Sequence, residues 1–213
     1  MDTRNPSPLD QLICRFDQAL RTVCAPARAG RASPAQGVSD TGLDTRQKSV
    51  AARLMRVNHA GEVAAQALYR GHAFSAATPA VRAQMERAAR EESDHLAWCE
   101  QRVRALGSHT SFLNPLWYTG SFALGVVTGL AGDTWSLGFV AETERQVVRH
   151  LDGHLARLPE ADAPSRAILA QMRADEAAHA AQAIEAGAGE LPPPVKTLMQ
   201  LTAQVMTRTA YWL

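Results

Sequence analysis

The sequence has little cysteine: three residues in 213, at positions 14, 24 and 99, and no CxxC pair. A disulfide-stabilised scaffold and a thiolate zinc site are therefore not expected, and a reducing compartment suits the chain better. An excess of charge of one sign is also missing, because 22 basic residues stand against 21 acidic ones. Without a basic surplus, nucleic acid is not an expected partner.

Long hydrophobic runs are scarce as well. The first 23 residues have no continuous apolar core of the kind found in secretory signals, and Asp10 and Asp17 are atypical of a mitochondrial transit peptide. From these features we expect a cytosolic chain of bacterial origin. The exception is the uncharged stretch 110–132, "TSFLNPLWYTGSFALGVVTGLAG". Its length would allow a membrane span, but Asn114, Pro115 and the glycines favour a buried or surface-inserted crossover helix.

Strand signals are absent, and a helical period dominates from about residue 46 onward. Apolar spacing predicts an all-α fold with four long helices, at 47–74, 79–106, 134–158 and 164–186. A short amphipathic helix over 9–23 and a linker rich in Pro, Ala, Gly and Ser precede them. A final helix follows "LPPP" at 191–194. We therefore expect residues 1–45 to form a short helix and linker, and residues 46–213 a four-helix-bundle catalytic domain.

Each of the four long helices has a glutamate within its apolar stripe when its residues are placed on a helical wheel: Glu62, Glu92, Glu144 and Glu176. Glu142 is expected on the opposite, polar side of its helix, and Arg56 is expected to point away from the stripe of Glu62. A buried carboxylate is costly unless a cation or a metal binds it. No set of arginines or lysines lies on these stripes, so the pattern indicates a metal centre.

Two of these glutamates are followed one helical turn later by histidine, as Glu92-x-x-His95 and Glu176-x-x-His179. Residues at i and i+3 share a helix face, so each pair can point at one object. The lone Glu62 precedes Glu92 by 30 residues, and the lone Glu144 precedes Glu176 by 32. The chain thus predicts two similar helical hairpins.

One Glu from each of two helices, plus Glu-x-x-His from each of the other two, is the pattern of di-iron or di-manganese carboxylate bundles. Carboxylates and imidazoles without thiolate disfavour structural zinc, and four carboxylates balance the charge of two Fe²⁺ ions. We expect Glu92 and Glu176 to bridge the metals. One further pair then completes the ligand set of each metal: Glu62 with His95 for one, and Glu144 with His179 for the other.

Four segments carry a family resemblance: "RVNHAGEVAAQALYRGH" (56–72), "EESDHLAWCE" (91–100), "FVAETERQVVRHLDGHL" (139–155) and "ADEAAHAAQA" (174–183). They resemble the demethoxyubiquinone hydroxylases of ubiquinone biosynthesis, and the similarity extends over about 47–213. The resemblance implies a ferritin-like four-helix bundle with a long apolar crossover helix and extra terminal helices.

It also implies an O₂-dependent monooxygenase with two iron ions (Fe²⁺) that hydroxylates the ring of a 2-polyprenyl-3-methyl-6-methoxy-1,4-benzoquinol. Such an enzyme would sit peripherally on the cell membrane, with the uncharged 110–132 stretch dipping into the interface. A homo-oligomer and an assembly with other ubiquinone-biosynthesis proteins are both left open.

Three other functions stay open. A ferritin-like iron oxidase would use similar ligands but has no need of the uncharged stretch. A rubrerythrin-like peroxidase usually adds a cysteine-rich module, and a metal-free helical interaction protein would tolerate changes of the glutamates. Among nearby residues, Tyr69 is placed to hydrogen-bond a ligand carboxylate. For His59 and His150, a supporting or proton-relay role and simple packing are equally compatible with the sequence.

Overall fold

The computed structural model describes residues 7–40 and 42–213, and every regular element in these ranges is a helix. The seven helices are α1 (Pro8–Cys24), α2 (Thr45–Ser75), α3 (Pro79–Ala105), α4 (Asn114–Leu130), α5 (Asp133–Arg157), α6 (Ala163–Glu185) and α7 (Pro193–Trp212). All the helices expected from the sequence are therefore present, with ends within a few residues of the expected positions.

Local signals explain where the helices begin. Ser7 and Asp44 each accept a hydrogen bond from the backbone three residues later, in reciprocal capping boxes that start α1 and α2. The side chains of Thr78 and Asp162 also accept a backbone hydrogen bond at the start of α3 and α6, and each helix has a proline within its first two positions. Proline there loses no helical hydrogen bond, so these ends are set by the sequence itself.

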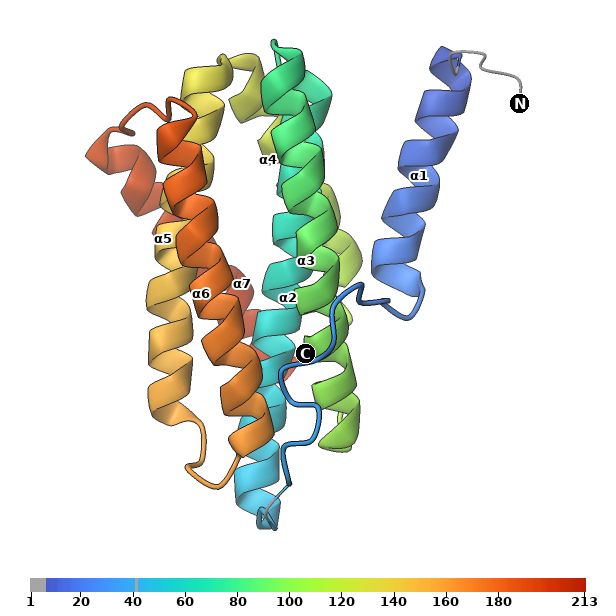
Figure 1. Ribbon diagram of the computed structural model, residues 1–213, viewed down its shortest axis with the longest axis vertical. Helices are drawn as coiled ribbons and strands as arrows, with labels where there is room; N and C mark the ends of the chain where they lie inside the picture. Colours follow the sequence, from blue (N-terminus) through green and yellow to red (C-terminus); the bar gives the residue numbers. More distant parts are fainter. Residues whose placement is uncertain (1–6, 41) are drawn as a thin grey trace.

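The bundle is built from two helical hairpins, α2–α3 and α5–α6 (Figure 1). The helix α4 crosses from the first hairpin to the second, α7 packs against α2 and α5, and α1 lies along the outside beside α2 and α4. The chain is thus an all-α ferritin-like bundle with a crossover helix and extra terminal helices. A core of apolar residues fills the space between the hairpins, and it includes Leu54, Trp98, Leu151 and Leu169.

The crossover helix α4 is joined to α2 by a glycine contact. A Cβ added at Gly125 would lie 2.3 Å from the carbonyl oxygen of Leu68, and one added at Gly71 would lie 2.3 Å from that of Phe122. Only glycine allows the two backbones to approach this closely. None of the helices in the described ranges is both long and apolar enough to cross a membrane.

Two polar residues are less exposed than the helical wheels predict. Arg56 is buried because the loop between α3 and α4 covers it: its guanidinium donates to the backbone oxygen of His109 at 2.8 Å and to Ser108 at 2.7 Å. Glu142, expected on the polar side of its helix opposite Glu144, is also buried. The helix α7 covers this face of α5, and Gln146 links Glu142 to the backbone of Lys196.

The segment before α2 is attached to the bundle. The backbone of Ala27 donates to Glu100 at 2.8 Å, and Asp40 pairs with Arg102 at 2.9 Å. Residues 1–6 and 41, which belong to the expected N-terminal region 1–45, lie outside the described residues. The division of the chain into two regions at residue 45 stays a prediction.

Candidate metal centre

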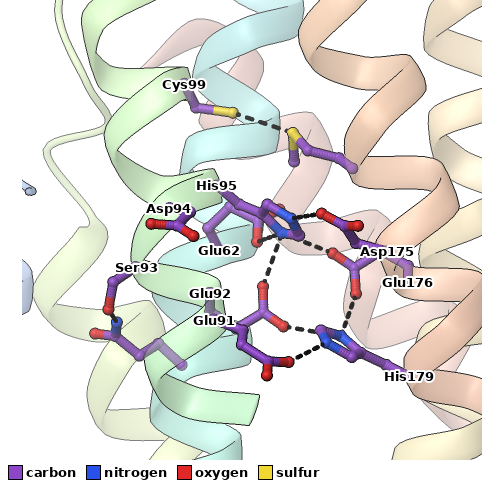
Figure 2. A network of polar contacts seen from close by, with 12 residues as sticks. Glu62, Glu91, Glu92, Ser93, Asp94, His95, Cys99, Asp175, Glu176 and His179 are labelled. Atoms are coloured by element: carbon purple, nitrogen blue, oxygen red, sulfur yellow. Dashed lines mark hydrogen bonds and ion pairs between the residues drawn. The ribbon is translucent and has the colours of Figure 1, made fainter. Parts of the chain in front are cut away.

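The fold brings the predicted cluster together in the middle of the bundle. Each of the four helices α2, α3, α5 and α6 contributes at least one of the six predicted ligands, and each ligand is at most 7% exposed. The six are Glu62, Glu92, His95, Glu144, Glu176 and His179. Figure 2 shows five of them pointing toward one another across the gap between the hairpins: Glu62, Glu92, His95, Glu176 and His179.

The two motif glutamates lie between the two histidines. His95 Nδ1 is 3.1 Å from Glu92 Oε2 and 3.0 Å from Glu176 Oε1. His179 Nδ1 is 3.3 Å from Glu92 Oε1 and 3.1 Å from Glu176 Oε2. Each of these carboxylates therefore presents one oxygen to each imidazole, which is the arrangement a pair of bridging ligands needs (Figure 2).

The two lone glutamates occupy different positions around this core. Glu62 Oε2 lies 3.6 Å from His95 Nδ1, and Glu62 offers a ligand atom within 4.8 Å of those of Glu92, His95 and Glu176. Glu144 lies outside that group of four. It accepts a hydrogen bond from the Tyr69 hydroxyl at 2.5 Å, which confirms the expected contact of Tyr69 with a cluster glutamate.

Two further carboxylates, which were not expected from the sequence, contact the Nε2 atoms of the imidazoles. Asp175 Oδ2 is 2.9 Å from His95 Nε2, and Glu91 Oε2 is 2.8 Å from His179 Nε2. Each directly precedes a motif glutamate and contacts the histidine of the opposite helix. A repeated acidic residue before Glu-x-x-His was visible in the sequence and could have indicated them. A carboxylate on Nε2 fixes the ring so that the Nδ1 lone pair faces the cluster.

His59 and His150 lie away from the cluster. His59 is within 3.5 Å of Asn114, at the start of α4. The ring of His150 lies against that of His154, with their centroids 3.9 Å apart. Both contacts are those of packed histidines.

The family model described as "Ubiquinone biosynthesis protein COQ7" matches residues 49–210. The chain belongs to this family. Proteins named 3-demethoxyubiquinol 3-hydroxylase include a Nitrosococcus oceani relative that is 57% identical, with 100% of both chains covered. The Chromobacterium violaceum protein of that name is 57% identical over 95% of this chain and 98% of its own. The expectation of an enzyme of ubiquinone biosynthesis is thereby confirmed.

Burial and close carboxylate–imidazole contacts shift the pKa values of this COQ7-family cluster. Removal from water raises the pKa of Glu62 and of Glu144 well above the usual carboxyl value. Burial alone would lower the pKa of His179, but its close contacts with the carboxylates of Glu176 and Glu92 raise it to about 12. The carboxylates around His95, of which Asp175 contributes most, raise the pKa of that imidazole too, against the effect of burial. Without a metal, the cluster therefore retains protons that a cation would displace.

The donor set fits divalent metal ions. Four carboxylates and two imidazoles without a thiolate are ligands that suit iron or manganese. The buried Glu92 Oε1 accepts no hydrogen bond within the described chain, since its 3.3 Å contact with His179 lacks hydrogen-bond geometry. A buried carboxylate oxygen without a donor is costly, and a metal ligand bond would satisfy it.

A small opening of about 20 Å³ reaches the cluster at the His179 side. Its walls come from α2, α3, α5 and α6, and they include Tyr69, Met85, Glu91, Val140, His179 and Gln182. A volume of this size holds roughly one water molecule. This opening lies on the side of His179.

Proposed function

We propose that this protein is an O₂-dependent di-iron monooxygenase that hydroxylates the ring of demethoxyubiquinol, a 2-polyprenyl-3-methyl-6-methoxy-1,4-benzoquinol. The observation that carries the proposal is the pair Glu92 and Glu176, each with one oxygen toward His95 and one toward His179. The relatives that are 57% identical to the chain bear the name of this hydroxylase, which supports the choice of substrate.

Two iron ions would be held by the six cluster residues, with Glu92 and Glu176 shared between them. Glu62 and His95 would complete one metal position, and Glu144 and His179 the other. Bound iron supplies the activation of O₂, which side chains alone cannot perform.

The chain's own residues prepare this site. Asp175 and Glu91 hold the two imidazoles by Nε2, so that each Nδ1 is free to bind a metal. The Tyr69 hydroxyl fixes one oxygen of Glu144. The surrounding apolar side chains exclude water, which strengthens every electrostatic interaction within the cluster.

The quinol ring would approach through the opening beside His179. An opening of about 20 Å³ is smaller than the ring, so its walls must move for the substrate to enter. Met85, which lines the opening, has the flexible side chain that such a movement needs.

The polyprenyl tail suggests a peripheral position on the cytoplasmic side of the cell membrane. The outer face of α4 exposes large apolar side chains, and α1, which packs beside α4, exposes more of them: Leu116, Leu124, Val127 and Leu130 from α4, and Leu9, Ile13, Phe16 and Leu20 from α1. An amphipathic surface of this kind binds the interface of a bilayer without crossing it.

Iron content and product formation together test the proposal. Protein loaded with Fe²⁺ without oxygen should hold close to two irons per chain. On addition of O₂ and a reductant it should convert demethoxyubiquinol to a product heavier by one oxygen atom. Glu92→Ala and Glu176→Ala should each lose both irons, because a bridging carboxylate serves both metals.

The rival functions predict different results. A ferritin-like oxidase would oxidise many irons per chain and leave the quinol unchanged, and a rubrerythrin-like enzyme would consume peroxide instead. Stoichiometric zinc with full hydroxylase activity would overturn the di-iron proposal.

A further inference from the structure

Residues 27–40, here called the N-terminal strap, lie across the outside of α3 on the His95 side of the bundle. In Figure 1 the chain between α1 and α2 runs along the bundle beside α3. The backbone of Gly30 donates to Asp94 Oδ1 at 2.6 Å, and that of Arg31 donates to the same oxygen at 3.2 Å. Together with the contacts of Ala27 and Asp40, these bonds fix the strap on α3.

Arg31 links the strap to both hairpins. Its Nε lies 2.6 Å from Asp94 Oδ2 on α3, and its Nη2 lies 2.9 Å from Asp175 Oδ2 on α6. The guanidinium also lies over the ring of Trp98, 4.9 Å from its centroid. A planar guanidinium with several donors can hold two carboxylates in fixed positions at once.

The oxygen that Arg31 holds is the one that binds His95. Asp175 Oδ2 is 2.9 Å from Arg31 Nη2 and 2.9 Å from His95 Nε2. Gln171 donates to the other oxygen of Asp175 at 2.9 Å, so the carboxylate is constrained on both sides. A continuous series of polar contacts therefore leads from the strap through Asp175 to an imidazole of the cluster.

The other histidine lacks an equivalent support. His179 Nε2 contacts Glu91, whose side chain is 52% exposed against 20% for Asp175. Within the described residues, His179 is the only ion-pair partner of Glu91. The opening to the cluster also lies on this side. The two halves of the centre, alike in ligand pattern, thus differ in what surrounds them.

We propose that Arg31 is a positioning residue that acts through Asp175 to hold His95, and so makes the His95 metal position less labile than the His179 position. The inference rests on the proposed two-metal site. Its consequence is that the N-terminal strap, which contributes no ligand, decides which of the two metals is retained.

Iron release tests the inference without measuring turnover. Protein holding two Fe²⁺ ions is mixed, without oxygen, with an excess of a coloured Fe²⁺ chelator, and the release is followed with time. Wild type should release its irons in two phases. Asp175→Asn should speed the slower phase by about 10- to 100-fold, the range for loss of a carboxylate behind a metal-bound histidine. Arg31→Gln should speed the same phase by a smaller factor, and Glu91→Gln the faster phase.

Matched variants separate positioning from simple coverage. Arg28→Gln changes an exposed arginine of the same segment and should release iron as wild type does. Arg31→Lys should restore part of the slow phase. In the double variant Arg31→Gln/Asp175→Asn the slow phase should be no faster than in Asp175→Asn alone, because Arg31 acts through Asp175.

Several results would overturn the inference: release by Arg31→Gln that matches wild type, equal acceleration of both phases, or additive effects in the double variant. Circular dichroism checks that each variant folds. If Arg31→Gln does not fold, the release rates of Asp175→Asn and Glu91→Gln are compared instead, and equal effects of these two variants on both phases would overturn the inference. Wild type that binds fewer than two irons would instead refute the proposed function on which the inference rests.

Discussion

At the scale of single residues, the centre is defined by carboxylates that the fold alone would not favour. Four glutamates and two histidines are buried at this centre, and burial raises the pKa of Glu62 and of Glu144. A core of apolar residues at these positions would fold at least as well, since buried ionic groups are weak contributors to stability. The cluster is therefore a functional feature, and bound metal ions would neutralise its charge.

Tyr69→Phe tests the hydroxyl that fixes Glu144. Because the pKa of Tyr69 is raised well above its usual value by burial, the hydroxyl stays protonated and donates at any working pH. Its loss should leave about two irons per chain but lower hydroxylation roughly 10-fold. Iron analysis and product formation measure the two effects, and Tyr118→Phe, a buried tyrosine on α4, is the control. Unchanged turnover in Tyr69→Phe would contradict the role.

A second comparison at this scale uses two glutamates of α5 that are two residues apart. Glu144→Gln should abolish hydroxylation and weaken iron binding, because it removes a proposed ligand. Glu142→Gln should leave both intact, although Glu142 is buried, because its partners are Gln146 and the half-exposed Arg149. An ion pair of this kind is worth about 0–1 kcal/mol, which chemical denaturation can measure. Equal loss of iron in both variants would show that the proposed ligand set is wrong.

At the scale of secondary-structure elements, the α2–α4 contact positions the ligand helix α2. Gly125→Ala would place a methyl group against the backbone of Leu68, so we expect destabilisation of roughly 1–3 kcal/mol. Gly120→Ala on the same helix meets no atom within 4 Å and should stabilise the protein by roughly 0.5–1 kcal/mol. Thermal or chemical denaturation of both variants gives the comparison. If both variants changed the free energy of unfolding in the same direction, the close approach of the α2 and α4 backbones at Gly125 would be refuted.

The contact of α2 with the start of α5 should make stability depend on pH. His72 is fully buried, 2.5 Å from the Ser136 hydroxyl, and burial lowers its pKa from 6.5 to about 4. Below pH 6.5 the unfolded chain binds a proton that the folded protein does not, so stability is lost as the pH falls toward 4. The slope for one group is about 1.4 kcal/mol per pH unit.

Denaturation of the metal-free protein at several pH values tests this dependence. His72→Gln should reduce the slope between pH 6.5 and 4 relative to wild type, whatever its effect on stability at pH 7. An identical slope in wild type and His72→Gln would contradict the prediction.

At the scale of the whole molecule, the sequence predicts what local patterns control. Helix positions followed from apolar spacing and from caps such as Asp44 and Thr78, and the inward glutamates followed from helix phase. Features created by packing between distant segments were missed. The buried Glu142 depends on α7, and the contact of Arg31 with Asp175 joins residues 144 positions apart. No periodic pattern carries such information, because neither partner belongs to the other's helix.

The last prediction concerns the exposed apolar surface of α4 and the proposed membrane attachment. Val127 is 65% exposed on this surface and is therefore the position to change. The neighbouring Val126 is less suitable, because it is half-buried and its backbone nitrogen faces α2, 2.9 Å from where a Cβ at Gly71 would be. Val127→Asp should weaken flotation with vesicles of bacterial lipid and lower turnover of a long-tailed quinol. Turnover of a short-tailed analogue in detergent should stay near that of wild type, because the cluster is untouched.

Ile184→Asp is the matched control, since Ile184 is an exposed apolar residue on α6, outside the α4 surface. It should float with vesicles as wild type does. Both variants should keep about two irons per chain. If Val127→Asp loses iron, α4 acts as part of the bundle core and the membrane role of its outer face fails. If the two variants lose flotation equally, attachment depends on general surface polarity and not on α4. A loss of flotation in Val127→Asp alone would show that the outer face of α4 binds the membrane that holds the substrate's tail. Because Gly125 of α4 contacts α2, the same helix would then link the membrane surface to the helix that carries Glu62.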